Sequence, residues 1–178
     1  MRGGGPLAKG MAVLAAAALA CAPAAAQPSD MAVKAAFLTK FPAYVSWPRP
    51  PAGGALNLCL IGTDPFGGLI DAAARGQQVD GRPIAVRRLP GTDGADACHI
   101  AFVQGPSDAR TAQMLQALRG KPVLTVTDSR GGAARGMIFF VVDGGRVRFH
   151  IDQAAAQQSG LGLSSRLLAI ALSVRTAR

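Results

Sequence analysis

The sequence predicts an α/β fold: a three-layer α/β/α sandwich around a mostly parallel sheet of about six strands, ending in an antiparallel hairpin. Short apolar runs alternate with segments of helical periodicity, the pattern of a sheet covered by helices. The runs are apolar throughout, as in strands that are buried on both faces. Near the C-terminus, two runs are separated by Asp143, Gly144 and Gly145, a hairpin signal.

The first expected element is a helix within residues 31–47. Ser29 or Asp30 can cap its start, since both side chains accept hydrogen bonds from free backbone amides. Pro42 is expected to bend or interrupt the helix because it removes a backbone donor. The apolar residues at helical spacing are Val33, Phe37, Phe41, Tyr44 and Val45.

The remaining elements follow in regular alternation. The strands expected in the parallel part are residues 56–61, 84–89, 99–104 and 122–128. Helices are expected to begin at residue 69 and to span residues 109–119. The hairpin consists of residues 137–142 and 146–151, and two further helices are expected to end the chain.

Residues 1–26 have the organisation of a secretory signal peptide, and residues 27–178 are expected to form a single domain. Arg2 and Lys9 supply the positive charge, residues 11–20 are apolar, and small residues reach Ala26, where cleavage is expected. An uncleaved anchor helix is the first alternative, and a lipoprotein that uses Cys21 is the second. The chain is therefore expected to be exported.

The charge distribution argues against nucleic acid as a partner. The net charge is +9 and the chain contains no Glu. The arginines are scattered along the sequence, and an exported protein seldom meets nucleic acid. Anionic ligands, anionic headgroups or an acidic partner surface fit this charge better, and simple solvation of the arginines explains it equally well.

Two cysteines follow the leader, Cys59 and Cys98. In an exported chain such a pair favours a disulfide. Free buried thiols and a metal site that uses the neighbouring His99 are the alternatives. No CxxC or HxxxH spacing completes a metal site, so no metal and no cofactor is expected.

No catalytic constellation is recognisable, so the chain is not expected to be an enzyme. There is no GxSxG elbow, and paired carboxylates would have to come from aspartates that mostly lie in turns. A hydrolase would need a nucleophile beside a base. The histidines, His99 and His150, fit structural or solvent-facing positions.

Two sets of residues are candidates for binding, one for a ligand or anion and one for a partner protein. Each set also has a purely structural explanation. Asp128 should end a strand at the carboxyl edge of the sheet, where α/β proteins place their sites, or it could simply close the following turn. The candidates for ligand or anion binding are Asp64, Asp128, Arg148, His150, Ser165 and Arg166. The candidates for partner binding are the clustered aromatics Phe41, Tyr44 and Trp47, for which core packing is the alternative.

Four segments together resemble the YfiR-like family of exported bacterial proteins, and they cover nearly all of the chain after the leader. Their order and spacing carry the resemblance, since no single motif is distinctive. The segments are residues 33–48 (VKAAFLTKFPAYVSWP), residues 58–67 (LCLIGTDPFG), residues 98–103 (CHIAFV) and the stretches within residues 136–168 that begin GMIFFV, VRFHID and GLGLSSRLL.

The resemblance implies a periplasmic α/β regulator that binds and inhibits a membrane-bound diguanylate cyclase through the periplasmic portion of the cyclase. Lower cyclic di-GMP and less biofilm would follow, and an outer-membrane lipoprotein could sequester the regulator. The resemblance also implies redox tuning through disulfides. Cys59 and Cys98 match one cysteine pair of the family, whereas residues 131–140 lack a second pair, so switching by that second bridge is not expected. A homodimer is compatible with this family. A small-ligand-binding sensor module is the alternative function.

Overall fold

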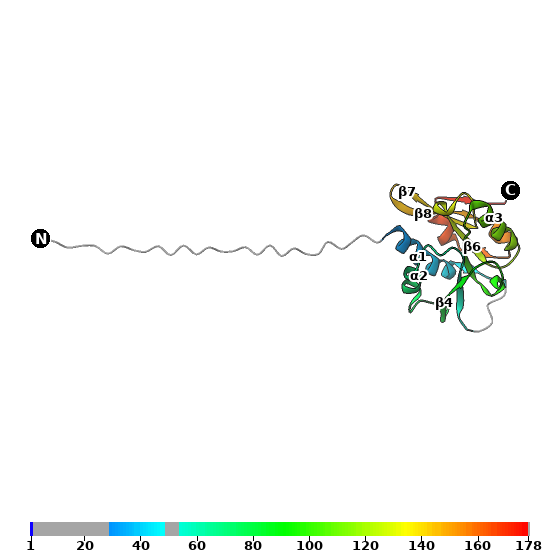
Figure 1. Cartoon of the computed structure of the whole chain (residues 1–178), viewed down its shortest axis with the longest axis horizontal. Coiled ribbons are helices and arrows are strands. Elements are labelled where there is room, and N and C mark those ends of the chain that lie inside the picture. The colour runs from blue at the N-terminus through cyan, green and yellow to red at the C-terminus, as the bar shows by residue number, and fades with distance from the viewer. Residues whose placement is uncertain (2–28, 49–53, 178) are drawn as a thin grey trace.

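The computed structural model describes Met1, residues 29–48 and residues 54–177. Apart from Met1, the expected signal peptide lies outside these residues. The described part is a mixed α/β structure built around a large, mostly parallel sheet (Figure 1), which confirms the predicted fold class.

The large sheet contains eight strands, in the order β10-β8-β7-β6-β5-β2-β4-β3. Its parallel strands include β2 (Leu56–Gly62), β4 (Arg82–Leu89), β5 (Ile100–Gln104) and β6 (Leu124–Asp128). At one side come β7 (Ile138–Asp143), β8 (Arg146–Asp152) and β10 (Ser173–Arg175). The two-residue strand β3 (Gln78–Val79) pairs antiparallel with β4 at the other side. A separate two-stranded sheet joins β1 (Val45–Ser46) to β9 (Gly162–Leu163).

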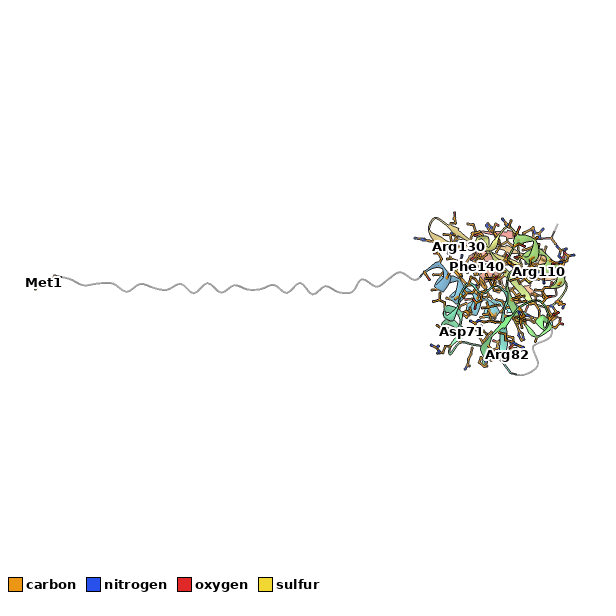
Figure 2. The ribbon with its side chains drawn as sticks, in the orientation of Figure 1. Met1, Asp71, Arg82, Arg110, Arg130 and Phe140 are labelled. Carbon is orange, nitrogen blue, oxygen red and sulfur yellow. A yellow bond between two sulfur atoms is a disulfide. The ribbon has the colours of Figure 1, made fainter. Side chains whose placement is uncertain are left out.

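Helices pack against both faces of this sheet. Along β2, Leu58 and Leu60 point into the larger apolar core together with α1 (Asp30–Lys40) and α2 (Gly68–Ala74). The alternate residue Ile61 points into a smaller core under α3 (Asp108–Ala117). Figure 1 shows α1 and α2 beside each other and α3 on a different side of the molecule. Figure 2 places Phe140 among the interior side chains.

The helix cap, the proline break and the hairpin turn occur where the sequence predicts them. Ser29 caps α1, and its hydroxyl accepts a hydrogen bond from the Ala32 backbone amide at 3.2 Å. The helix ends at Lys40, and Pro42 lies in the following 3₁₀ turn, residues Phe41–Tyr44. Gly144 and Gly145, with φ of 55° and 72°, form the turn between β7 and β8. Positive φ at both central residues is the geometry that matches the twist of a hairpin.

The C-terminal end differs from the prediction. Two short helices, α4 (Gln153–Gln158) and α5 (Ser165–Ala169), are present, but the chain continues into the strand β10, which runs parallel to β8. The expected terminal helix is therefore followed by a strand. In this strand Val174 is partly buried against the core. A tertiary contact therefore determines that this short segment is a strand. With β3, this strand raises the count above the expected six.

Cys59 and Cys98 form a disulfide, as the sequence favoured. Their Cα atoms are 5.9 Å apart, and the bond links β2 to the residue two positions before β5. Both side chains are buried in the smaller core beneath α3, beside Met114 and Leu118.

Candidate functional site

An apolar groove opens on the surface between α1 and α5, and we refer to it as the α1–α5 groove. Its volume is about 310 Å³, which is at the lower end of the range of small binding pockets. Eight residues line it: Val33, Ala36, Phe37, Lys40, Phe41, Tyr44, Leu167 and Ile170.

The spacing of residues along α1 explains why this helix has two apolar faces. Val33, Phe37 and Lys40 lie one helical turn apart and face the groove, as expected for positions three or four residues apart. Ala35 and Leu38 lie on the other face and are fully buried in the core. One face of α1 therefore holds the helix on the sheet, while the other remains available.

The floor of the groove is a packed aromatic cluster. The rings of Phe37 and Phe41 stack with centroids 5.7 Å apart. Phe41 meets Phe149 of β8 edge to face at 5.2 Å, and it stacks on Phe140 of β7 at 5.7 Å. Such contacts stabilise aromatic pairs by about 0.5–1.5 kcal/mol beyond their buried area, so the floor is a rigid surface.

The rim of the groove exposes large apolar side chains. Tyr44 is 37% exposed and Ile170 is 55% exposed. The small sheet positions them, because Val45 pairs with Leu163 and the Ser164 amide donates to the Tyr44 carbonyl at 2.9 Å. A rigid apolar floor with an exposed aromatic rim is suited to docking an apolar segment of a protein.

The structure separates the three aromatic residues proposed for partner binding. Phe41 lies in the floor of the groove and Tyr44 lies on its rim. Trp47 is half-buried outside the groove, where its ring meets His99 edge to face at 6.0 Å. The sequence did not indicate the contribution of α5, because nothing local places Leu167 and Ile170 beside a helix more than 120 residues earlier.

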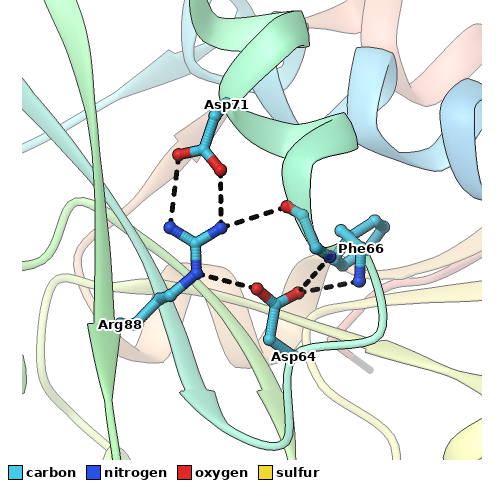
Figure 3. A network of polar contacts seen from close by, with 5 residues as sticks. Asp64, Phe66, Asp71 and Arg88 are labelled. Carbon is cyan, nitrogen blue, oxygen red and sulfur yellow. Dashed lines mark hydrogen bonds and ion pairs between the residues drawn. The ribbon is translucent and has the colours of Figure 1, made fainter.

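Asp64 is engaged in a polar network with Arg88 and Asp71 (Figure 3). One carboxylate oxygen of Asp64 accepts from the amides of Phe66 and Gly67, and the other accepts from Arg88 Nε at 2.8 Å. Arg88 also donates to both oxygens of Asp71, at 3.2 and 2.6 Å. This hydrogen bond from Arg88 lowers the pKa of Asp71, and Asp71 in turn raises the pKa of Arg88. The network fixes the turn before α2.

Asp128 is also engaged, at the carboxyl end of β6 where the sequence placed it. One oxygen accepts from Lys34 Nζ of α1 at 2.6 Å, and both side chains are buried. The other accepts from the Arg130 amide at 3.1 Å, which closes the turn. The two aspartates proposed for ligand binding therefore lie at the same edge of the sheet. Both carboxylates, however, already accept hydrogen bonds from groups of the protein.

The other four proposed ligand residues lie elsewhere. Arg148 and His150 project from the same face of β8, two residues apart and partly exposed. Ser165 and Arg166 are exposed on the first turn of α5. Ser164 is the cap of that helix, because its hydroxyl accepts from the Leu167 amide at 3.3 Å. The six residues thus form no common site.

The chain was compared with models of known protein families. A family model described as YfiR/HmsC-like matches residues 31–172, which includes the α1–α5 groove, the disulfide and the closing hairpin. The chain belongs to the YfiR/HmsC-like family.

Membership of the YfiR/HmsC-like family supports, in general terms, a periplasmic regulator of a diguanylate cyclase. Such a regulator acts through an interaction, and the family is regulatory and not catalytic. Within residues 29–48 and 54–177, no helix combines the length and the apolar character needed to cross a bilayer.

Proposed function

We propose that this protein binds the periplasmic portion of a membrane-bound diguanylate cyclase through the α1–α5 groove and inhibits the cyclase. The observation that carries the proposal is the groove itself: exposed Tyr44 and Ile170 over a rigid aromatic floor, in a chain of the YfiR/HmsC-like family. Buried aromatic and aliphatic anchors supply most of the binding energy in protein interfaces. Lower cyclic di-GMP and less biofilm would be the cellular consequence.

Export and redox state belong to the same proposal. Cleavage of the leader near Ala26 would release residues 27–178 into the periplasm, where the Cys59–Cys98 disulfide is stable. Because the bond is buried beneath α3, it supports the fold on which the groove is built. Reduction of the disulfide would lower the stability of this fold, and inhibition of the cyclase would weaken as a result.

Release of the cyclase needs a competitor for the regulator. An outer-membrane lipoprotein that presents an apolar segment could occupy the α1–α5 groove and so sequester the protein. Self-association through the same groove would give a homodimer that must dissociate before it inhibits. In either case the cyclase would compete for the α1–α5 groove, with the lipoprotein or with a second copy of this chain.

The direct test combines a binding measurement with a cellular one. Residues 27–178 and the purified periplasmic portion of a candidate cyclase are titrated by calorimetry, and the oligomeric state is measured by light scattering over the same concentrations. In cells, deletion of the gene should raise the level of cyclic di-GMP. Expression of the full chain in the deletion strain should bring this level back down to that of the parent strain. Unchanged cyclic di-GMP in every growth state would contradict the proposal, and so would a purified protein that binds no cyclase portion encoded in the same genome.

A further inference from the structure

One face of the sheet continues beyond α3 into a region where polar side chains line the surface. Helix α3 covers Cys59, Ala101 and Val103 of β2 and β5. The same face continues across β7, β8 and β10, where the register places Phe139 beside His150 and His150 beside Ser173. A further step along the strands pairs Asp152 with Arg175.

This face is hollowed into a cleft beside α3. Its volume is about 480 Å³, within the range of small-molecule sites. A second hollow of about 390 Å³ adjoins it, and four residues line both: Arg135, Gly136, Asp152 and Arg175. Gln158, the last residue of α4, and the buried Ser159 that follows it contribute polar groups. We refer to the two hollows together as the arginine cleft.

Arginine side chains from three separate segments converge on the arginine cleft. Arg119 follows the end of α3, Arg135 comes from the loop before β7, and Arg175 comes from β10. His150 adds an imidazole from β8. These positions are far apart in the sequence, so the folded chain gathers charges that look scattered along it.

Little negative charge balances these groups. Among the residues that the structure describes, Asp152 is the only acidic one that lines either hollow. One of its oxygens accepts from the Ala155 amide at 3.0 Å, and the other pairs with Arg175. Within the described residues, Arg119 and Arg135 have no carboxylate partner.

Several of the groups that line the cleft are held in place. The guanidinium of Arg135 lies 4.4 Å from the centroid of the Phe139 ring, a cation–π contact that orients it. His150 Nδ1 and Ser173 Oγ are 2.6 Å apart, which fixes the imidazole against β10. Because these groups are already ordered, a ligand would lose less entropy in engaging them.

We propose that the arginine cleft binds a small polyanion that carries phosphate or carboxylate groups. The planar fork of a guanidinium donates two parallel hydrogen bonds to either kind of group, and two such forks without an acidic partner face the cleft. The volume suits a metabolite-sized molecule. This site is separate from the α1–α5 groove and does not depend on the partner proposed for it.

Proton NMR of the two histidines tests the proposal directly. The probes are pyrophosphate and citrate, added to residues 27–178 at constant pH and constant ionic strength, because charge effects otherwise change with salt. The imidazole signals of His150 should shift and saturate. His99 is the internal control, since it packs on Trp47 outside the cleft and accepts from the Asn57 amide.

Matched charge variants separate the cleft from the general basicity of the chain. Arg135→Gln and Arg119→Gln should each weaken binding about tenfold, the effect of losing one charge-assisted contact. Arg87→Gln removes the same charge from an exposed position on β4, which β2, β5 and β6 separate from the hairpin, and should leave the affinity unchanged. All three variants are first checked for an unchanged melting temperature.

The outcomes discriminate clearly. Saturable binding of pyrophosphate alone assigns a phosphate ligand, binding of citrate alone assigns a carboxylate ligand, and either result supports the site. A failure of both probes to shift His150 would overturn the proposal. The same holds if His99 shifts in parallel with His150, or if Arg87→Gln weakens binding as much as Arg135→Gln does.

Discussion

Lys34 of α1 and Asp128 of β6, 94 residues apart in the sequence, form a buried ion pair in which Nζ lies 2.6 Å from Oδ2. Lys34 is completely inaccessible to solvent. The pair ties the first helix to the carboxyl edge of the sheet. It therefore fixes the helix whose other face lines the α1–α5 groove.

Removing the lysine should strongly destabilise the fold. Lys34→Met leaves the Asp128 carboxylate buried without its counter-charge, and breaking a buried pair on one side costs about 3–5 kcal/mol. The free energy of unfolding from urea titration measures the loss. Lys40→Met is the matched control, because Lys40 is exposed on the same helix and a surface change typically costs under about 0.5 kcal/mol.

A double variant tests whether the loss comes from the pair. Asp128→Asn keeps an oxygen that can accept from the Arg130 amide, so Lys34→Met with Asp128→Asn should cost clearly less than the two single changes added together. Strict additivity within about 0.5 kcal/mol would show that the two side chains do not interact energetically.

Local chemistry explains which parts of the fold the sequence could predict. The Asp143-Gly144-Gly145 turn and the break at Pro42 depend on neighbours in the chain, and both occur where expected. The end of β6 at Asp128 also follows from its own apolar run. In each case the signal and the structure that it specifies lie within a few residues.

Long-range contacts explain what the sequence could not predict. Nothing near Lys34 indicates that it pairs with Asp128, since a lysine on a helix is usually solvated. The strand β10 depends on pairing with β8, and the α1–α5 groove depends on α5 packing beside α1. Likewise, Arg119, Arg135 and Arg175 meet only in the folded chain.

The Cys59–Cys98 disulfide should contribute substantially to stability. The bond closes a separation of 39 residues, for which the chain-entropy model gives roughly 4 kcal/mol and practice usually less. Cys59→Ala with Cys98→Ala should therefore lower the melting temperature by several degrees. Scanning calorimetry of the oxidised protein, the reduced protein and the variant checks this. Identical melting temperatures with and without reductant would show that the bond adds nothing.

His99 should make stability depend on pH in a defined direction. Burial lowers the pKa of its imidazole below the usual 6.5, with Arg82 as a secondary cause. The folded state therefore binds fewer protons than the unfolded state, so the stabilising contribution is complete above pH 6.5 and is lost as the pH falls towards the folded pKa. An NMR titration of the His99 ring gives the pKa directly. A midpoint at or above 6.5 would contradict this account.

Charge placed on the rim of the α1–α5 groove should weaken binding of the proposed cyclase portion without unfolding the protein. Ile170→Asp sets a carboxylate at an exposed site that would be desolvated in the complex, so the dissociation constant should rise about tenfold or more. Tyr44→Ala should act in the same direction by removing an aromatic anchor.

Leu69→Asp is the matched control for this change. Leu69 is 41% exposed on α2 and does not line the groove, so the same substitution there introduces the same charge on a different surface. Calorimetric titration of the three variants, with melting temperatures to confirm folding, measures the difference. If Leu69→Asp weakened binding as much as Ile170→Asp, net charge and not the groove would govern the interaction. If Ile170→Asp bound as tightly as the parent protein, the partner would have to dock on another surface.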